Sequence, residues 1–293
     1  MKLNLQNNST QEILQHMSSI DLTTNEIVEI SITQNDLDNI GYKSWVDFAQ
    51  IFYLKMLTPH LENDIIILKF QKLDTSNSFH KNKTLSNEKY GVDSEFFDID
   101  KTNYFSFVHY YTKALEFINI KQKQRILNLG INKGDEFKVI KNMLNNENLS
   151  NKEFIGIDYS QSIIDYAQNN FTTSNFNFLC HDINKLEELN LGKFDLIISI
   201  GTLQSSNINF KTVFMNLYQN YLEKDGSIIL GFPNCRWIDK QMIYGAKAPN
   251  YNFPEMSLVI KDIYFCKKYL QQKKYRVTIT GKDYIFLTAR KIK

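Results

Sequence analysis

From about residue 104 onward, short apolar runs alternate with segments whose apolar residues recur every three or four positions. This alternation predicts strands joined by helices, and therefore a mostly parallel sheet with helices on both faces. The predicted strands are 126–129, 154–157, 176–180, 194–200, 227–232, 275–280 and 284–289. The predicted helices are 104–120, 135–145, 160–170, 209–222 and 257–272. Only Gly281-Lys282-Asp283 separates the last two strands, so these two must pair antiparallel.

The N-terminal part of the chain has a different pattern. Residues 1–10 are polar and are expected to be loose, and the following segments predict a small α+β unit. Its elements are expected at about 11–18 (helix), 26–33 (strand), 44–56 (amphipathic helix) and 64–72 (strand). A polar stretch at about 74–89 has no apolar period and is predicted to be a linker. The expected domains are therefore 1–90, including this linker, and 91–293.

The composition argues against a membrane-spanning, secreted or metal-binding protein. No apolar run approaches the roughly 18 residues of a membrane span, and the first residues lack the apolar core of a secretion signal. The three cysteines are widely spaced, as expected for reduced thiols, so we expect a cytoplasmic protein. The five histidines are scattered and no cysteine pair has CxxC spacing, so no metal site is expected.

The small net charge of +2 hides an asymmetry along the chain. Residues 1–100 hold 8 Lys and Arg against 15 Asp and Glu, whereas residues 234–293 hold 13 against 4. A basic C-terminal region can face an anionic partner, although lysines on the solvated face of a helix would give the same count.

A glycine-bearing turn follows the first strand of the C-terminal pattern. The residues are Asn128-Leu129-Gly130-Ile131-Asn132-Lys133-Gly134, and the next helix begins at once. Glycine allows positive φ and close approach of a ligand, and a helix N-terminus offers free N–H donors. Taken alone, the turn is a weak signal for a nucleotide-like ligand.

Polar residues follow the next three strands as well, at the edge where open α/β sheets bind ligands. Asp158 follows the second strand, where a carboxylate can accept hydrogen bonds from ribose hydroxyls. His181-Asp182-Ile183 follows the third, where a carboxylate can accept from an adenine amino group. Gly201-Thr202-Leu203-Gln204 follows the fourth. The alternative interpretations are a helix N-cap for Asp158 and a plain turn residue for Asp182.

In this order, these motifs resemble those of the class I S-adenosylmethionine-dependent methyltransferases, over roughly residues 105–293. The resemblance implies a Rossmann-like fold with seven strands and a terminal antiparallel hairpin, and S-adenosylmethionine as the cofactor. Asn128 stands where the family usually has an acid, and Asn132 replaces its middle glycine. The cofactor-binding residues implied or expected are Gly130, Asn132, Gly134, Asp158, Tyr159, Asp182, Ile183, Ser199 and Tyr90.

Two other classes of protein are compatible with this order of strands and helices. A nicotinamide-dependent oxidoreductase needs a small residue at the third position of its glycine fingerprint, where this chain has Asp135. A non-catalytic protein with the same fold remains open because of Asn128 and Asn132.

The acceptor is less well defined. The chain lacks the Asn/Asp-Pro-Pro-Tyr/Phe motif of adenine amino-methyltransferases, so we expect a small or peptide-like acceptor, with tRNA or rRNA as the alternative through the basic C-terminal region. The catalytic residue is unknown. Four residues are weak candidates for a role at the acceptor: His109, Gln204, Arg236 and Tyr244. The oligomeric state is not predicted.

Overall fold

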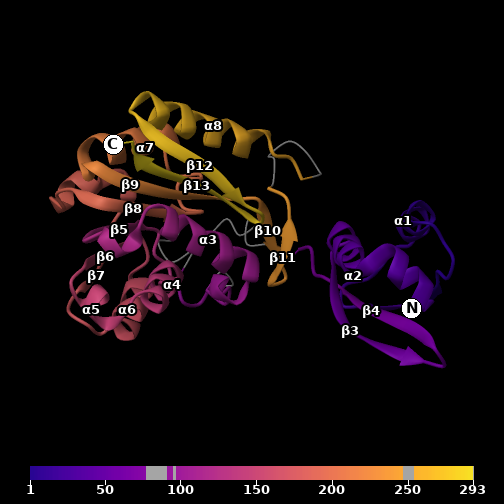
Figure 1. The fold of residues 1–293 in the computed structure, drawn as a ribbon. Helices are drawn as coiled ribbons and strands as arrows, with labels where there is room; N and C mark the ends of the chain where they lie inside the picture. Colours follow the sequence, from indigo (N-terminus) through magenta and orange to yellow (C-terminus); the bar gives the residue numbers. More distant parts are fainter. Residues whose placement is uncertain (77–90, 95–96, 247–253, 293) are drawn as a thin grey trace. The chain divides into compact units, whose positions relative to one another are not determined.

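The computed structural model describes residues 1–76, 91–94, 97–246 and 254–292. The chain divides into two compact units (Figure 1), residues 1–83 with 237–244 and residues 84–236 with 245–293. The first unit therefore takes in Trp237–Tyr244, a segment that the sequence pattern assigns to the C-terminal domain. The division into domains at residues 90 and 91 stays a prediction.

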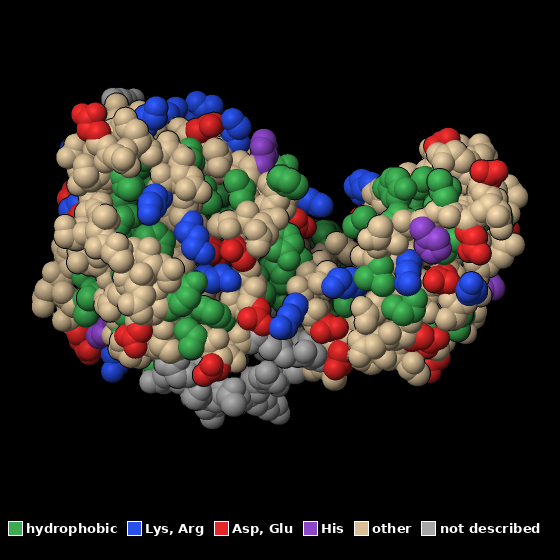
Figure 2. Space-filling model, turned by 90° about the horizontal axis from the view of Figure 1, so that it is seen from below, with side chains coloured by type: hydrophobic (Ala, Val, Ile, Leu, Met, Phe, Trp, Pro, Cys, Tyr) green, Lys and Arg blue, Asp and Glu red, His purple; other side chains and the backbone are tan. Residues whose placement is uncertain are grey.

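The first unit is a four-stranded sheet with two helices, and acidic side chains lie on the face of it that Figure 2 shows. The strand order is β1-β2-β4-β3, and its core includes the fully buried Trp45 and Phe70. Its elements are β1 (Lys2–Asn4), α1 (Thr10–Ser18), β2 (Ile27–Ile32), α2 (Gln34–Ile51), β3 (Leu54–Glu62) and β4 (Ile65–Lys72).

Three sequence predictions in this unit are wrong. Residues 2–4 form a strand because they pair in parallel with β2. The helix predicted at 44–56 begins ten residues earlier, because Thr33 and Asp36 form a capping box there, and it kinks at Gly41. Residues 54–62 form β3, whose pairing with β4 shifts register between Leu57 and His60, and this irregularity accommodates the proline at 59.

The second unit contains the predicted seven-stranded sheet. Its order is β12-β13-β9-β8-β5-β6-β7, and only β13 runs antiparallel to its neighbours. The strands are β5 (Arg125–Leu129), β6 (Glu153–Asp158), β7 (Phe176–Cys180), β8 (Phe194–Ile200), β9 (Leu222–Pro233), β12 (Tyr275–Gly281) and β13 (Tyr284–Lys291). The predicted fold class is confirmed: an α/β unit with a mostly parallel sheet that ends in an antiparallel hairpin.

Helices cover both faces of this sheet (Figure 1). On one face lie α3 (Phe105–Phe117), α4 (Asp135–Met143) and α6 (Gln161–Asn170), and on the other α7 (Phe210–Asn216) and α8 (Ser257–Gln272). A short helix, α5 (Asn146–Ser150), precedes β6, and a 3-10 helix spans Ile183–Leu189. The helix predicted at 209–222 is divided into α7 and a π-helical turn, Leu217–Tyr221.

Two short strands that the sequence does not predict follow β9. They are β10 (Cys235–Ile238) and β11 (Gln241–Tyr244), and they pair as a hairpin. Asp239 and Lys240 between them both have positive φ, as a tight two-residue hairpin turn requires.

The order of the strands in the large sheet reverses direction between β5 and β8. From β5 the chain adds β6 and β7 on one side, and it then crosses to β8 and β9 on the other side of β5. Ligands of open α/β sheets bind beyond the carboxyl ends of the strands at such a switch. Residues just after β5, β6, β7 and β8 therefore form the candidate site.

Candidate functional site

The loop after β5 is a tight turn held against β6. The N–H groups of Gly130 and Ile131 both donate to the Ile157 carbonyl, at 2.8 and 3.1 Å. Gly130, Asn132 and Gly134 have φ of 72°, 44° and 82°, all in the left-handed region. Asparagine adopts this conformation more readily than most residues, so the turn forms without the family's middle glycine.

The two glycines are needed for packing within the protein. A Cβ built on Gly130 would lie 1.9 Å from the Thr202 Oγ1, and one on Gly134 would lie 2.5 Å from the Phe171 ring. The sequence expectation was that glycine leaves room for a ligand. The structure fills that space with side chains from beyond β8 and from the end of α6. Thr202 therefore packs against the glycine turn. The sequence places it in the motif Gly201–Gln204 but does not predict this contact.

Asp158, the last residue of β6, ties the loop to the neighbouring strand end. Its carboxylate accepts from the Asn132 N–H at 3.0 Å and from the Ser160 N–H at 3.2 Å. The side chain is 9% exposed, so it is nearly buried yet lies at the rim of the sheet. The pattern places this acid after the second strand, and the structure brings it beside the glycine turn.

The segment after β7 is held next to Asp158. The His181 N–H donates to the Asp158 carbonyl at 2.8 Å. Asp182 Oδ1 accepts from both the backbone and side-chain nitrogens of Asn184, so this acid caps the 3-10 helix that follows. Ile183 is 8% exposed within the core, whereas Tyr159 is 45% exposed.

Two candidates after β8 differ in their surroundings. The Ser199 side chain is 2% exposed and its hydroxyl donates to the Leu129 carbonyl at 3.4 Å, which favours a structural role inside the sheet. Gln204 is half-buried, and its Oε1 is buried without a hydrogen-bond partner among the described residues. An unsatisfied buried acceptor is unfavourable, so this oxygen is suited to a donor from a ligand.

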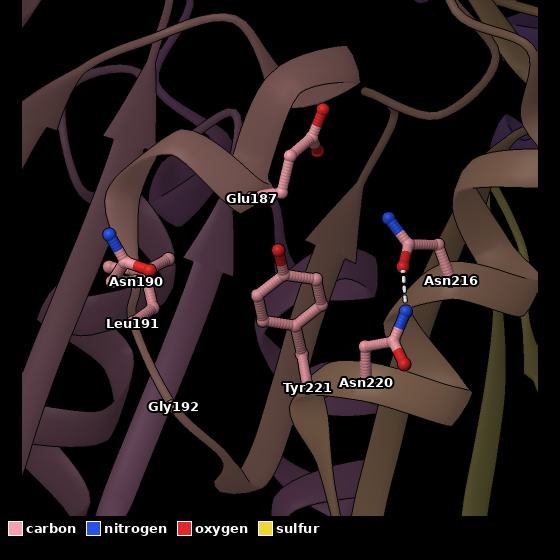
Figure 3. Close-up of a pocket in the computed structure, with 7 residues that line it drawn as sticks. All are labelled: Glu187, Asn190, Leu191, Gly192, Asn216, Asn220 and Tyr221. Atoms are coloured by element: carbon pink, nitrogen blue, oxygen red, sulfur yellow. Dashed lines mark hydrogen bonds between the residues drawn. The ribbon is translucent and has the colours of Figure 1, made fainter.

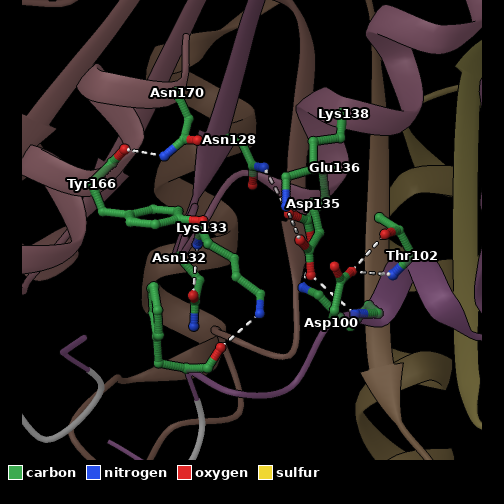
Figure 4. A network of polar contacts seen from close by, with 12 residues as sticks. Asp100, Thr102, Asn128, Asn132, Lys133, Asp135, Glu136, Lys138, Tyr166 and Asn170 are labelled. Carbon is green, nitrogen blue, oxygen red and sulfur yellow. Dashed lines mark hydrogen bonds and ion pairs between the residues drawn. The ribbon is translucent and has the colours of Figure 1, made fainter. Parts of the chain in front are cut away.

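Beneath the loop lies a buried charge network that the sequence does not reveal (Figure 4). The Lys101 ammonium pairs with Glu136 at 2.6 Å, and both side chains are almost fully buried. The Lys101 N–H donates to Asp135, which also pairs with Lys138 at 3.2 Å. Burial lowers the pKa of Lys101, but the carboxylates of Glu136 and Asp135 outweigh it and raise that pKa. Asp135, which does not fit a dinucleotide site, is thus a structural acid at the start of α4.

This network reaches the position where the family usually has an acid. The Asn128 Nδ2 lies 3.4 Å from Glu136 Oε2, so a carboxylate sits beside the amide (Figure 4). Asn128 is fully buried, and its Oδ1 has no hydrogen-bond partner among the described residues. The Tyr111 hydroxyl is also buried and has none there. Burial, and then Glu136, raise the pKa of Tyr111 well above its usual value, so the hydroxyl keeps its proton.

We expect Tyr111→Phe to leave the second unit as stable as the wild type or up to about 1 kcal/mol more stable, because it removes a buried donor without a partner. Tyr111→Leu is the matched control: it also removes the ring that packs on Phe107 and Phe286, and should cost about 2–4 kcal/mol. Urea unfolding of the three proteins gives both values. A loss above 1 kcal/mol in Tyr111→Phe would contradict the expectation and reveal a bonded hydroxyl.

The remaining candidates have different surroundings. His109 is exposed on α3 and contacts the Tyr110 ring, and Arg236 is half-buried on β10. Tyr244 is 45% exposed and belongs to the first unit. Tyr90 lies outside the described residues. Among the part of the chain that the structure describes, no group of three or more His, Cys, Asp or Glu side chains is arranged to hold a metal, and no helix is long and apolar enough to cross a membrane.

A cavity of about 590 Å³ opens at the other end of the strands (Figure 3). Its lining residues precede β8 and β9, so they lie at the amino-terminal ends of these strands. Glu187, Asn190, Asn216 and Asn220 present carboxylate and amide groups around the Tyr221 hydroxyl (Figure 3). None of the predicted site residues lines this cavity.

A family model described as a methyltransferase domain matches residues 120–279, more than half of the chain. No curated protein matches.

Three solved structures illustrate the structural matches. The plantazolicin methyltransferase BpumL, solved with S-adenosylhomocysteine, is 13% identical, with a TM-score of 0.48 over 71% of this chain and 94% of that one. An S-adenosylmethionine-dependent methyltransferase from Aquifex aeolicus is 15% identical, with a TM-score of 0.43 over 62% and 89%. A ribosomal protein L11 methylase from Lactobacillus delbrueckii subsp. bulgaricus is 15% identical, with a TM-score of 0.39 over 63% and 80%.

Proposed function

The chain belongs to the methyltransferase-domain family of class I S-adenosylmethionine-dependent enzymes, and on this premise we propose that it methylates a small or peptide-like acceptor. One observation supports the site more than any other. The Asp158 carboxylate stands where the glycine turn meets the end of β6, and accepts the Asn132 N–H at 3.0 Å. A carboxylate at that junction is suited to the ribose hydroxyls of the cofactor.

The other groups at this edge fit the rest of S-adenosylmethionine. Asp182 uses Oδ1 in its helix cap, and its Oδ2 is suited to the adenine amino group. Asn128 Oδ1 is a buried acceptor without a described partner, below the loop that would hold the methionine end. A cationic ammonium group supplies donors for such an acceptor. In this interpretation Asn128 and Asn132 are compatible with cofactor binding.

S-Adenosylmethionine supplies a methyl group that its sulfonium sulfur already activates. The protein therefore needs mainly to hold the acceptor atom in line and close, and to exclude water. Gln204 follows β8 and is our candidate for this positioning, because its buried Oε1 lacks a described partner. An amide oxygen can orient an acceptor O–H or N–H group, although it does not serve as a base. A base is needed only where the acceptor loses its proton late.

The acceptor assignment rests on the chain's own residues after β8 and β9. The segment Gly201–Gln204 lacks the motif of adenine amino-methyltransferases. Arg236, half-buried just past β9, offers a guanidinium group for an anionic part of a substrate. We propose a small or peptide-like acceptor on these grounds, with tRNA or rRNA as the second candidate because of the basic C-terminal region.

Methyl transfer from labelled S-adenosylmethionine into fractionated extract of a deletion strain tests this proposal. We expect label in a metabolite or peptide fraction that appears only when the protein is added. Label in RNA would replace the acceptor assignment by the second candidate. Calorimetry with S-adenosylmethionine is the parallel measurement: absence of binding in the micromolar range would instead indicate a non-catalytic relative.

A further inference from the structure

Five basic side chains gather at the open end of the β12–β13 hairpin: Lys273, Lys274, Arg276, Arg290 and Lys291. We call this group the basic edge. Arg276 and Arg290 face each other directly in the strand register, and Lys291 faces Tyr275 beside them. Like charges at directly opposite positions destabilise an antiparallel pair. The arginine pair therefore works against the hairpin that carries it.

Aromatic rings and helix ends explain part of this arrangement. Arg276 and Arg290 both lie over the Phe117 ring, at 5.8 and 4.7 Å from its centre. Arg290 also donates to the Phe117 carbonyl at 3.3 Å, and the Lys291 ammonium donates to the Lys273 carbonyl at 2.8 Å. These two bonds stabilise the C-terminal ends of α3 and α8. They account for Arg290 and Lys291. Arg276 contacts the Phe117 ring without a hydrogen bond to a helix end, and the Lys273 ammonium lies 5.7 Å from the centre of the Tyr269 ring.

Acidic side chains do not neutralise the basic edge. Within the described part of the chain, none of its five members forms an ion pair. Of the neighbouring acids, Glu116 on α3 pairs with Lys113. Asp225 on β9 lies near Tyr275, whose pKa is raised by burial first, then by Tyr218 and then by Asp225. The excess of basic residues at 234–293 is thus partly concentrated at one place in the fold.

We propose that the basic edge is a docking surface for the phosphate backbone of a nucleic acid. Arginine guanidinium groups match phosphate geometry, and basic side chains interleaved with aromatic rings are typical of such surfaces. The cations also occupy both faces of the hairpin end, since Arg276 and Arg290 face α3 whereas Lys291 faces α8. A strand of phosphates can run around the hairpin end and contact both faces, whereas a flat membrane cannot contact both faces at once.

The position of the basic edge separates docking from methyl transfer. Arg290 pairs with Ser227 toward the amino-terminal end of β9, whereas the glycine loop follows the carboxyl end of β5. The two regions therefore lie at opposite ends of the strands. Docking at the basic edge does not require that RNA be the methyl acceptor, so it goes beyond the function proposed above.

Fluorescence anisotropy with a labelled single-stranded RNA of about 20 nucleotides tests the proposal on the full chain. We expect binding that weakens with salt, and a triple variant K273Q/K274Q/R276Q whose log–log salt slope is smaller by about 2, since each lost phosphate contact removes about 0.7. The matched control is K185Q/K211Q, which removes two lysines from segments that follow β7 and β8 at the cofactor edge. Its salt slope should equal that of the wild type.

Three outcomes would overturn the proposal: no salt-dependent RNA binding by the wild type, an unchanged slope in the triple variant, or a loss that appears in K185Q/K211Q instead. Vesicles containing phosphatidylserine form a parallel arm, and binding to them without binding to RNA would also reject it in favour of a membrane. Affinity for S-adenosylmethionine, measured in every variant, should be unchanged. It separates a failure of docking from a failure of the methyltransferase function.

Discussion

Replacing Glu136 with Leu should destabilise the second unit by about 3–5 kcal/mol, because it leaves a buried ammonium without its partner. Lys101 and Glu136 are 2.6 Å apart, with side chains 8% and 1% exposed. Charge pairs at the surface contribute far less, since water screens them. The substitution also removes the acceptor beside Asn128 Nδ2. Urea unfolding followed by far-ultraviolet circular dichroism measures the loss.

The double variant K101M/E136L is the control for this prediction. Removing both partners of a buried pair is often neutral or stabilising, so we expect it to recover most of the lost stability. A second control is pH. In E136L the unpaired, buried Lys101 should have a lowered pKa, so the folded state favours the neutral amine. The variant should then gain stability relative to the wild type as pH rises from 7 toward 10. A loss below 1 kcal/mol, or one that the double variant does not recover, would show that the pair is not buried as described.

The sheet of the second unit was predictable because its signals are local and repeated. Each buried strand is a short apolar run, and the three-residue turn at 281–283 allows only an antiparallel pair. The family, the fold and S-adenosylmethionine as cofactor were recognised from motifs at strand ends, and the family match over residues 120–279 confirms them. A cytoplasmic location and the individual site residues stay predictions.

Elements that depend on distant partners were missed. Residues 54–56 were predicted as the end of a helix, and they belong to strand β3 because β4 lies beside them. β1 has three residues and exists only through its parallel pairing with β2. The hairpin β10–β11 rests on two non-glycine residues with positive φ, Asp239 and Lys240, which carry no strong turn signal in the sequence.

The site shows the same division between local and distant causes. Asp158 and the glycine turn were predictable because each follows its own strand. The partner of Glu136 was not, since Lys101 lies 35 positions away and ahead of the first strand of the sheet. Nor does the sequence show that Thr202 and Phe171 fill the space beside the two glycines. Packing of this kind depends on which side chains the fold brings together.

Replacing Asp158 with Ala should weaken S-adenosylmethionine binding by about 10- to 100-fold, because hydrogen bonds to a charged group contribute about 1.5–3 kcal/mol. Two effects combine here. The carboxylate is our proposed partner of the ribose hydroxyls, and it also holds the glycine turn through the Asn132 N–H. Calorimetry with S-adenosylmethionine measures the affinity, and Asp165→Ala, which removes an exposed acid of α6, is the matched control that should bind normally.

A ligand without the ribose 2′-hydroxyl separates the two effects. If Asp158 contacts the ribose directly, the wild type should bind the 2′-deoxy form of S-adenosylhomocysteine more weakly than the parent compound, whereas Asp158→Ala should bind the two equally. If Asp158 only shapes the turn, the affinity of both proteins should fall by the same factor when the 2′-hydroxyl is removed. The coupling energy between Asp158 and that hydroxyl would then be zero. Equal losses, or an unchanged affinity of Asp158→Ala for S-adenosylmethionine, would refute the ribose role. The direct contact is the outcome that we expect, since one carboxylate has acceptor sites for both the Asn132 N–H and a ribose hydroxyl.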